Sequence, residues 1–163
     1  MTQQSPAPRN ITFGIDTFGD TAVDLEGNPV PHAQTLRNVI DQAVLAEKVG
    51  VDFIGLGEHH RADYSISAPD IMMTAILART ERLKVTSAVT VLSSDDPVRI
   101  FERWSTMNAI SNNRAEITLG RGSFIESFPL FGFDLQDYEL LFNERLDLFR
   151  TILDADRAGK GVT

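Results

Sequence analysis

The sequence predicts an α/β protein built on a parallel sheet, and three observations carry this prediction. Short apolar runs of strand length alternate four times with segments whose apolar residues recur at helical spacing. None of the runs shows the strict polar alternation of a strand with one solvated face. Each run is followed by a helix-length segment, the connection that parallel strands need. Four such units fit a doubly wound open sheet, or the first half of a TIM-type β/α barrel, which normally needs about 250 residues.

The first two units consist of two apolar runs and the segments that follow them. The first run is Ile11–Ile15, and a loop rich in glycine and proline separates it from a helix predicted over about 35–48. That helix ends at Gly50, a residue type that commonly terminates helices. The second run is Phe53–Gly57, and its helix is expected to start near Pro69, because proline fits the first helical turn.

The third and fourth units carry clearer boundary signals. The third run, 85–92, is rich in β-branched residues, and the acidic, proline-containing segment 94–97 predicts the start of a helix. Two asparagines at 112–113 suit a turn with a left-handed residue. The fourth run covers 115–119, and a last helix is predicted over about 138–153.

Composition narrows the class of protein. The 163 residues are 42% apolar and 23% charged, with a net charge of −8, as in an ordinary globular domain. The charges are spread along the chain, whereas nucleic acids and anionic membranes bind clustered lysines and arginines. No apolar run approaches the roughly 20 residues of a membrane span. The absence of cysteine excludes disulfides, thiolate metal sites and a cysteine nucleophile. We expect a cytoplasmic protein that binds neither nucleic acid nor membrane.

Three segments are expected along the chain. Residues 1–10 lack the features of a signal peptide and are predicted to be a flexible leader. Residues 11–155 form the β/α units, and residues 156–163 are predicted to be a tail leading to a second half. A free half-barrel would leave strand edges unpaired and apolar surface exposed. The alternatives are therefore a piece of a longer protein, a proteolytic fragment, or a half completed by a partner.

A carboxylate and two imidazoles, Glu58-His59-His60, directly follow the second run. In parallel α/β proteins ligands bind at the carboxyl ends of the strands. Strand alternation would send Glu58 and His60 to one side and His59 to the other. The spacing is not that of a zinc motif and no third ligand lies nearby, which argues against a metal site. These residues could simply be satisfied polar groups, but three ionisable groups together favour a functional site.

The fourth run ends in Gly120-Arg121-Gly122. A guanidinium between two glycines offers charge and unobstructed backbone amides to an anion such as phosphate or carboxylate. A structural turn with a solvated arginine is the ordinary alternative, and the segment is not a dinucleotide fingerprint. The apolar loop at 124–133 contains four phenylalanines. It could wall a flat aromatic ligand or cover the end of the barrel.

With these motifs in order, the chain resembles the bacterial luciferase-like monooxygenase family of flavin-dependent enzymes. The resemblance runs from about Ile11 to Leu153 and implies a β/α barrel about twice as long as this chain. The matching segments are Glu58-His59-His60, Ser87–Leu92 leading to Pro97-Val98, Ser111–Gly122 and Leu130–Asp134.

The resemblance implies a set of cofactor contacts. Arg121, with Gly122 beside it, would bind the phosphate of flavin mononucleotide (FMN). Glu58 would lie near the flavin ring. Ala88 and Val89 would be joined by a non-proline cis peptide bond beneath that ring.

The resemblance also implies a reaction. His59 would be the catalytic histidine, with His60 beside it, and a neutral imidazole near the flavin could move protons. Reduced FMN and dioxygen would oxygenate a small organic substrate. Two alternatives stay open: hydride transfer with a deazaflavin coenzyme, or a truncated, non-catalytic flavin-binding or interaction module.

The expected partners follow from the same resemblance. They are the substrate, dioxygen, a separate flavin reductase, and a second copy of the chain. Family members commonly dimerise through the second and third helices of this half, which would bury Met72, Ile76, Trp104 or Met107. The isolated chain is expected to be inactive, because members of the family take further phosphate contacts and pocket walls from their second half.

Overall fold

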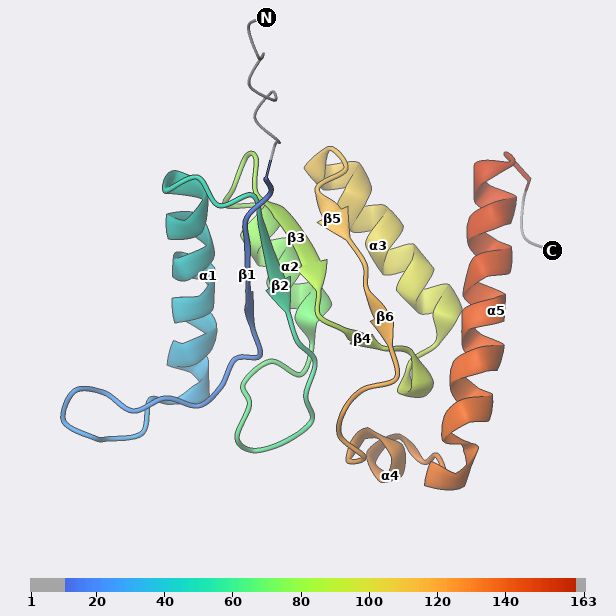
Figure 1. Ribbon diagram of the computed structural model, residues 1–163, viewed down its shortest axis with the longest axis horizontal. Coiled ribbons are helices and arrows are strands. Elements are labelled where there is room, and N and C mark those ends of the chain that lie inside the picture. Colours follow the sequence, from blue (N-terminus) through green and yellow to red (C-terminus); the bar gives the residue numbers. More distant parts are fainter. Residues whose placement is uncertain (1–10, 161–163) are drawn as a thin grey trace, which may run out of the picture.

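The computed structural model describes residues 11–160, so the leader predicted at residues 1–10 lies outside the described residues, as do residues 161–163 of the tail. The strands are short and the helices longer (Figure 1). The strands are β1 Gly14–Thr17, β2 Phe53–Leu56, β3 Lys84–Ser87, β4 Thr90–Val91, β5 Ala115–Glu116 and β6 Leu119–Gly120. The helices are α1 His32–Lys48, α2 Pro69–Leu77, α3 Pro97–Ser111, α4 Ser127–Phe131 and α5 Tyr138–Arg157, with 3₁₀ turns at η1 Leu92–Ser94 and η2 Leu135–Asp137.

The strands follow one another in chain order. One sheet has the order β1-β2-β3-β5, and a second pairs β4 with β6; every pairing is parallel. In a doubly wound sheet the strand order reverses at a switch point. The order of this sheet does not reverse. The sequential order is that of a barrel arc, so of the two predicted architectures the structure has the β/α barrel type. All strands point their carboxyl ends toward the same edge, the lower one in Figure 1.

One face of the sheet is packed under helices. Ile54, Leu56 and Val85 are at most 1% exposed and join the same core cluster as the apolar residues of α1, α2 and α3. Strand alternation places every second side chain on this face. The same alternation puts Lys84 and Glu116 on the opposite face, where they form an ion pair of 2.6 Å.

The core also contains the residues expected at a dimer interface. Met72, Ile76, Trp104 and Met107 are each at most 8% exposed within a single chain. A partner could reach them only by opening the core, so the prediction that these four side chains form the dimer contact is wrong. Their apolar spacing on α2 and α3 is explained by packing against the sheet. The homodimer itself stays a prediction.

Several boundaries differ from those the sequence predicts. The run at 85–92 divides into β3 and β4, which belong to different sheets, and the peptide bond between Ala88 and Val89 is cis, as the resemblance implied. The fourth run divides similarly into β5 and β6. Helix α5 continues to Arg157, so the first two residues of the predicted tail are helical. The apolar loop after Arg121 contains the short helix α4.

The β1 edge of the arc exposes apolar side chains, as expected of an incomplete barrel. Ile11, Phe13 and Ile15 are 69%, 64% and 42% exposed. β1 pairs with β2 on one side and with no strand on the other within residues 11–160. No helix in the described part of the chain has the length and apolar character needed to cross a membrane.

Candidate functional site

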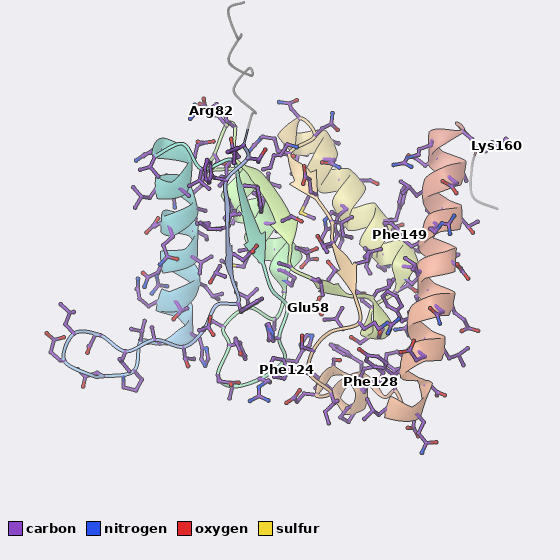
Figure 2. The ribbon with its side chains drawn as sticks, viewed as in Figure 1. Glu58, Arg82, Phe124, Phe128, Phe149 and Lys160 are labelled. Atoms are coloured by element: carbon purple, nitrogen blue, oxygen red, sulfur yellow. The ribbon has the colours of Figure 1, made fainter. Side chains whose placement is uncertain are left out.

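The carboxyl end of the sheet brings the predicted site residues together. Figure 2 shows Phe124 at the end of the molecule opposite Arg82, with Glu58 between them where the strands end. A small cavity there is lined by residues 58–60 and Val91 on one side and by residues 122–124 on the other. The acid–imidazole cluster and the loop that begins at Gly122 therefore share one mouth, although they are more than 60 residues apart in the sequence.

Glu58 and His60 form a nearly buried pair on one side of the strand end. Nε2 of His60 lies 3.0 Å from Oε1 of Glu58, and the two side chains are 11% and 10% exposed. The other carboxylate oxygen of Glu58 accepts a 3.0 Å hydrogen bond from the backbone N–H of Val91. Val91 lies in β4, two residues after the cis bond. Glu58 therefore ties the end of β2 to the segment that follows Ala88–Val89.

His59 points to the other side of the strand end, into a group of aromatic rings. Tyr64 stacks on the imidazole at a centroid distance of 4.2 Å. Phe18 and Phe124 meet it edge-on at 5.2 and 5.1 Å. The predicted alternation of Glu58 and His60 against His59 is confirmed.

The aromatic surroundings determine the protonation of His59. Desolvation by burial lowers the pKa of His59 below its ordinary value, outweighing the carboxylates of Asp20, Glu58 and Asp63, which act in the opposite direction. Nδ1 is buried and has no hydrogen-bond partner among the described residues. The neutral imidazole therefore has Nε2 as the atom that can exchange a proton with a bound molecule.

Two side chains of the β1 segment cross over glycines of the β2 segment. A Cβ at Gly55 would lie 1.9 Å from Oδ1 of Asp16 and 3.1 Å from Cβ of Ala88, and a Cβ at Gly57 would lie 2.2 Å from the ring of Phe18. Only glycine permits these approaches. Sequence reasoning missed Asp16 and Phe18. The available signal was the pair of glycines two residues apart, which marks one strand face that another chain segment approaches closely.

Arg121 turns outward rather than into the shared cavity. Its guanidinium makes a 2.8 Å ion pair with Glu139 at the start of α5 and lies 5.0 Å from the ring centre of Phe142. The two charged side chains are 44% and 62% exposed, and a pair so exposed contributes at most about 1 kcal/mol. An anion of higher charge could take the place of Glu139 at modest cost.

The loop after Arg121 offers further donors. Gly122 has φ of 80° and lies in the left-handed region. Within residues 11–160, the backbone N–H groups of Gly122, Ser123 and Phe124 take part in no hydrogen bond. A guanidinium followed by free amides is a chemical match for a phosphate group.

A cavity of about 410 Å³ opens beside the histidines and is lined by His32, His59, His60, Tyr64 and Leu130, among others. His32 precedes the helix predicted over about 35–48, but α1 begins at His32 itself. Nδ1 of His32 lies 3.0 Å from the hydroxyl oxygen of Ser65. The volume suits a small organic molecule. Between residues 11 and 160, no three His, Cys, Asp or Glu side chains are grouped so as to hold a metal ion.

A sequence profile of the luciferase-like monooxygenases matches residues 11–161, nearly the whole chain. The chain belongs to the luciferase-like monooxygenase family. Its relatives include an uncharacterized protein of Sinorhizobium fredii, 31% identical over 71% of this chain and 33% of that protein. The alkanal monooxygenase alpha chain of the Kryptophanaron alfredi symbiont is 24% identical over 80% of this chain and 37% of its own length.

Solved structures support the same fold. The oxygenating constituent of 3,6-diketocamphane monooxygenase from Pseudomonas putida, in complex with FMN, matches with a TM-score of 0.76, 18% identity, 86% of this chain and 39% of its own. A coenzyme F420-dependent tetrahydromethanopterin reductase from Methanopyrus kandleri matches with a TM-score of 0.58, 18% identity, 77% of this chain and 31% of its own. The region matched spans about a third of the length of the curated relatives.

Proposed function

We propose that the protein carrying this chain is a flavin-dependent monooxygenase that uses reduced FMN and dioxygen to oxygenate a small organic substrate. The observation that carries the proposal is the convergence at one mouth of a neutral, proton-exchanging imidazole and a loop with a free anion-binding face. Membership of the luciferase-like family supports it. When bound, reduced FMN would supply the electrons that activate dioxygen.

The residues present fit the phosphate end of FMN. Arg121 would exchange its exposed partner Glu139 for the phosphate, a bidentate acceptor that a guanidinium binds well. The unpaired N–H groups that begin at Gly122 would complete the anion site. Binding there would fix the cofactor at the mouth of the barrel.

The remaining site residues act around the flavin ring. Ala88 and Val89 would lie beneath it, as the family resemblance implies. Glu58, whose carboxylate is occupied by His60 and Val91, would hold that segment through β4. His59 would move the proton through Nε2, with His60 fixed beside it by Glu58.

A deazaflavin-dependent hydride transfer is the second candidate, since the fold is also that of an F420-dependent reductase. The same anion site and imidazole would serve it. The two candidate functions differ in their use of dioxygen. A monooxygenase consumes it and incorporates one atom into the product, whereas a deazaflavin enzyme does not. We further propose a cytoplasmic homodimer supplied with reduced FMN by a separate reductase.

The test uses the full-length protein and FMN binding followed by flavin fluorescence. Arg121→Ala is expected to weaken binding at least about tenfold, the loss of one charge-assisted contact. Arg150→Ala, at an exposed position of α5, is the matched control and should leave binding unchanged. Oxygen consumption with reduced FMN is then measured with and without the protein. Equal FMN affinity of wild type and Arg121→Ala, or oxygen uptake by the saturated wild type equal to that of free reduced FMN, would overturn the assignment.

A further inference from the structure

The loop from Gly122 to Glu126 closes over His59, and the side chain of Arg61 ties it to the loop after β2. Phe124 supplies the covering ring, 5.1 Å from the imidazole centre and 5.8 Å from that of Tyr64. The guanidinium of Arg61 lies 4.7 Å from the centre of the Phe124 ring, on which it stacks. Arg61 belongs to the loop after β2, so the contact joins segments more than 60 residues apart.

Arg61 is held in place by carboxylates from both loops. Nη1 donates to Oε1 of Glu126 at 2.6 Å, across the junction. Nε and Nη2 donate to the two oxygens of Asp63 at 2.9 and 3.0 Å, a bidentate pair within its own loop. The planar guanidinium can make these bonds and stack on Phe124 at the same time, which a lysine ammonium cannot.

We propose that Arg61 and Phe124 are positioning residues that latch the 122–126 loop over His59, shielding one side of its imidazole from water and fixing the ring for proton transfer at Nε2. The role in proton transfer rests on the function proposed above. The latch itself is a property of the described residues and needs no cofactor to be measured.

The charges around His59 explain why such a cover matters. Asp20, Glu58 and Asp63 favour the imidazolium, His60 disfavours it, and burial tips the balance to the neutral ring. Arg61 stacks on Phe124, which meets His59 edge-on, and Glu126 pairs with Arg61. Opening the loop would hydrate the ring and reduce its desolvation, so the carboxylates would raise the pKa of His59. Loss of Arg61 would also leave Asp63 unpaired, adding to the attraction for a proton.

The test is a pH titration of selectively ¹³C-labelled histidines in the protein without flavin, followed by NMR, with His59 assigned from a His59→Gln variant. Phe124→Ala and Arg61→Ala are each expected to raise the midpoint of His59 by about one pH unit, a tenfold change in its proton affinity. Arg61→Lys, which retains the charge without the planar stack, should give a smaller rise. Phe131→Ala is the matched control, because Phe131 meets His60 edge-on at 5.0 Å, and it should leave the His59 titration unchanged.

Glu126→Gln is a milder variant that tests the latch even if Phe124→Ala or Arg61→Ala fails to fold. Its side chain is 37% exposed, so the substitution loosens the latch without touching the core and should shift His59 upward by a few tenths of a pH unit. A His59 titration identical to wild type in the folded Phe124, Arg61 and Glu126 variants would overturn the latch. A shifted titration in a protein that fails to bind FMN would leave the latch standing and remove the proposed function instead.

Discussion

The two ends of the sheet differ in how their polar groups are hydrogen-bonded. At the amino end, Arg114 donates to the carbonyls of Leu77, Leu83 and Ser111 and to the hydroxyl of Thr80. The carboxylate of Glu47 accepts three backbone N–H groups there. At the carboxyl end, buried polar atoms lack partners. Among residues 11–160 they are Thr35 Oγ1, His59 Nδ1, Thr90 Oγ1, Ser93 Oγ, Glu126 Oε2 and Ser127 Oγ.

The contrast separates stability from function. Figure 2 shows Arg82 at one end of the molecule and Phe124 at the other. An unpaired buried polar group costs free energy that a bound ligand or water can recover. Saturated hydrogen bonding at the amino end suits a role in holding the fold, and open hydrogen bonding at the carboxyl end suits a role in binding.

The largest expected effect comes from Arg114. Arg114→Ala would leave three carbonyls and the Thr80 hydroxyl without their donor, and we expect a loss of about 3 kcal/mol in the free energy of unfolding, measured by urea denaturation. Arg114→Lys should recover part of the loss, because an ammonium retains the charge but cannot reach all four acceptors. The His59 titration should not move in either variant. A shift there would show that the two ends are coupled.

Two buried threonines, one at each end of the sheet, should give smaller changes in stability when the hydroxyl is removed. The two changes should have opposite signs. Thr80 and Thr90 are 6% and 1% exposed. The Thr80 hydroxyl donates to Ile76 and accepts from Arg114, whereas the Thr90 hydroxyl has no partner among the described residues. Thr80→Val should destabilise by about 1–2 kcal/mol, and Thr90→Val should be neutral or stabilise by up to about 1 kcal/mol. Equal losses in thermal or urea unfolding would contradict the comparison.

The smallest effects are in the pH dependence of stability. Folding lowers the pKa of His59 from 6.5, because burial disfavours the charged ring. In Glu47, burial raises the pKa, but the N–H donors of Arg82, Leu83 and Glu81 outweigh it and leave it below 4.5. Each lowered pKa gives stability that is present above the unfolded value and lost as the pH falls through the folded one.

The two ends should therefore weaken in different pH windows. As the pH falls, the carboxyl end loses stability first, below 6.5, and the amino end follows, below 4.5. His59→Gln should flatten the first part of the stability curve and Glu47→Gln the second, each by a few tenths of a kcal/mol, allowing for solvent screening. Urea unfolding across this pH range measures both. The same flattening in both variants would contradict the separation.

The sequence by itself determined the features that depend on neighbours along the chain. Asp96 caps α3 by accepting from the backbone N–H groups of Val98 and Arg99, as the acidic start signal predicts. Asn112 takes the left-handed conformation, with φ of 57°. The strand-end alternation that gives His59 and His60 different surroundings also follows from local geometry, because successive side chains of an extended segment point to opposite faces.

The tertiary structure alone decided the features that depend on distant neighbours. The division of the third and fourth runs depends on which strand each half pairs with, and no propensity within 85–92 records that choice. The partner of Arg121, the crossing of Asp16 over Gly55 and the covering of His59 by Phe124 each join segments that only the fold brings within reach. Local backbone preference is written in adjacent residues, whereas side-chain contacts depend on how the strands and helices pack in space.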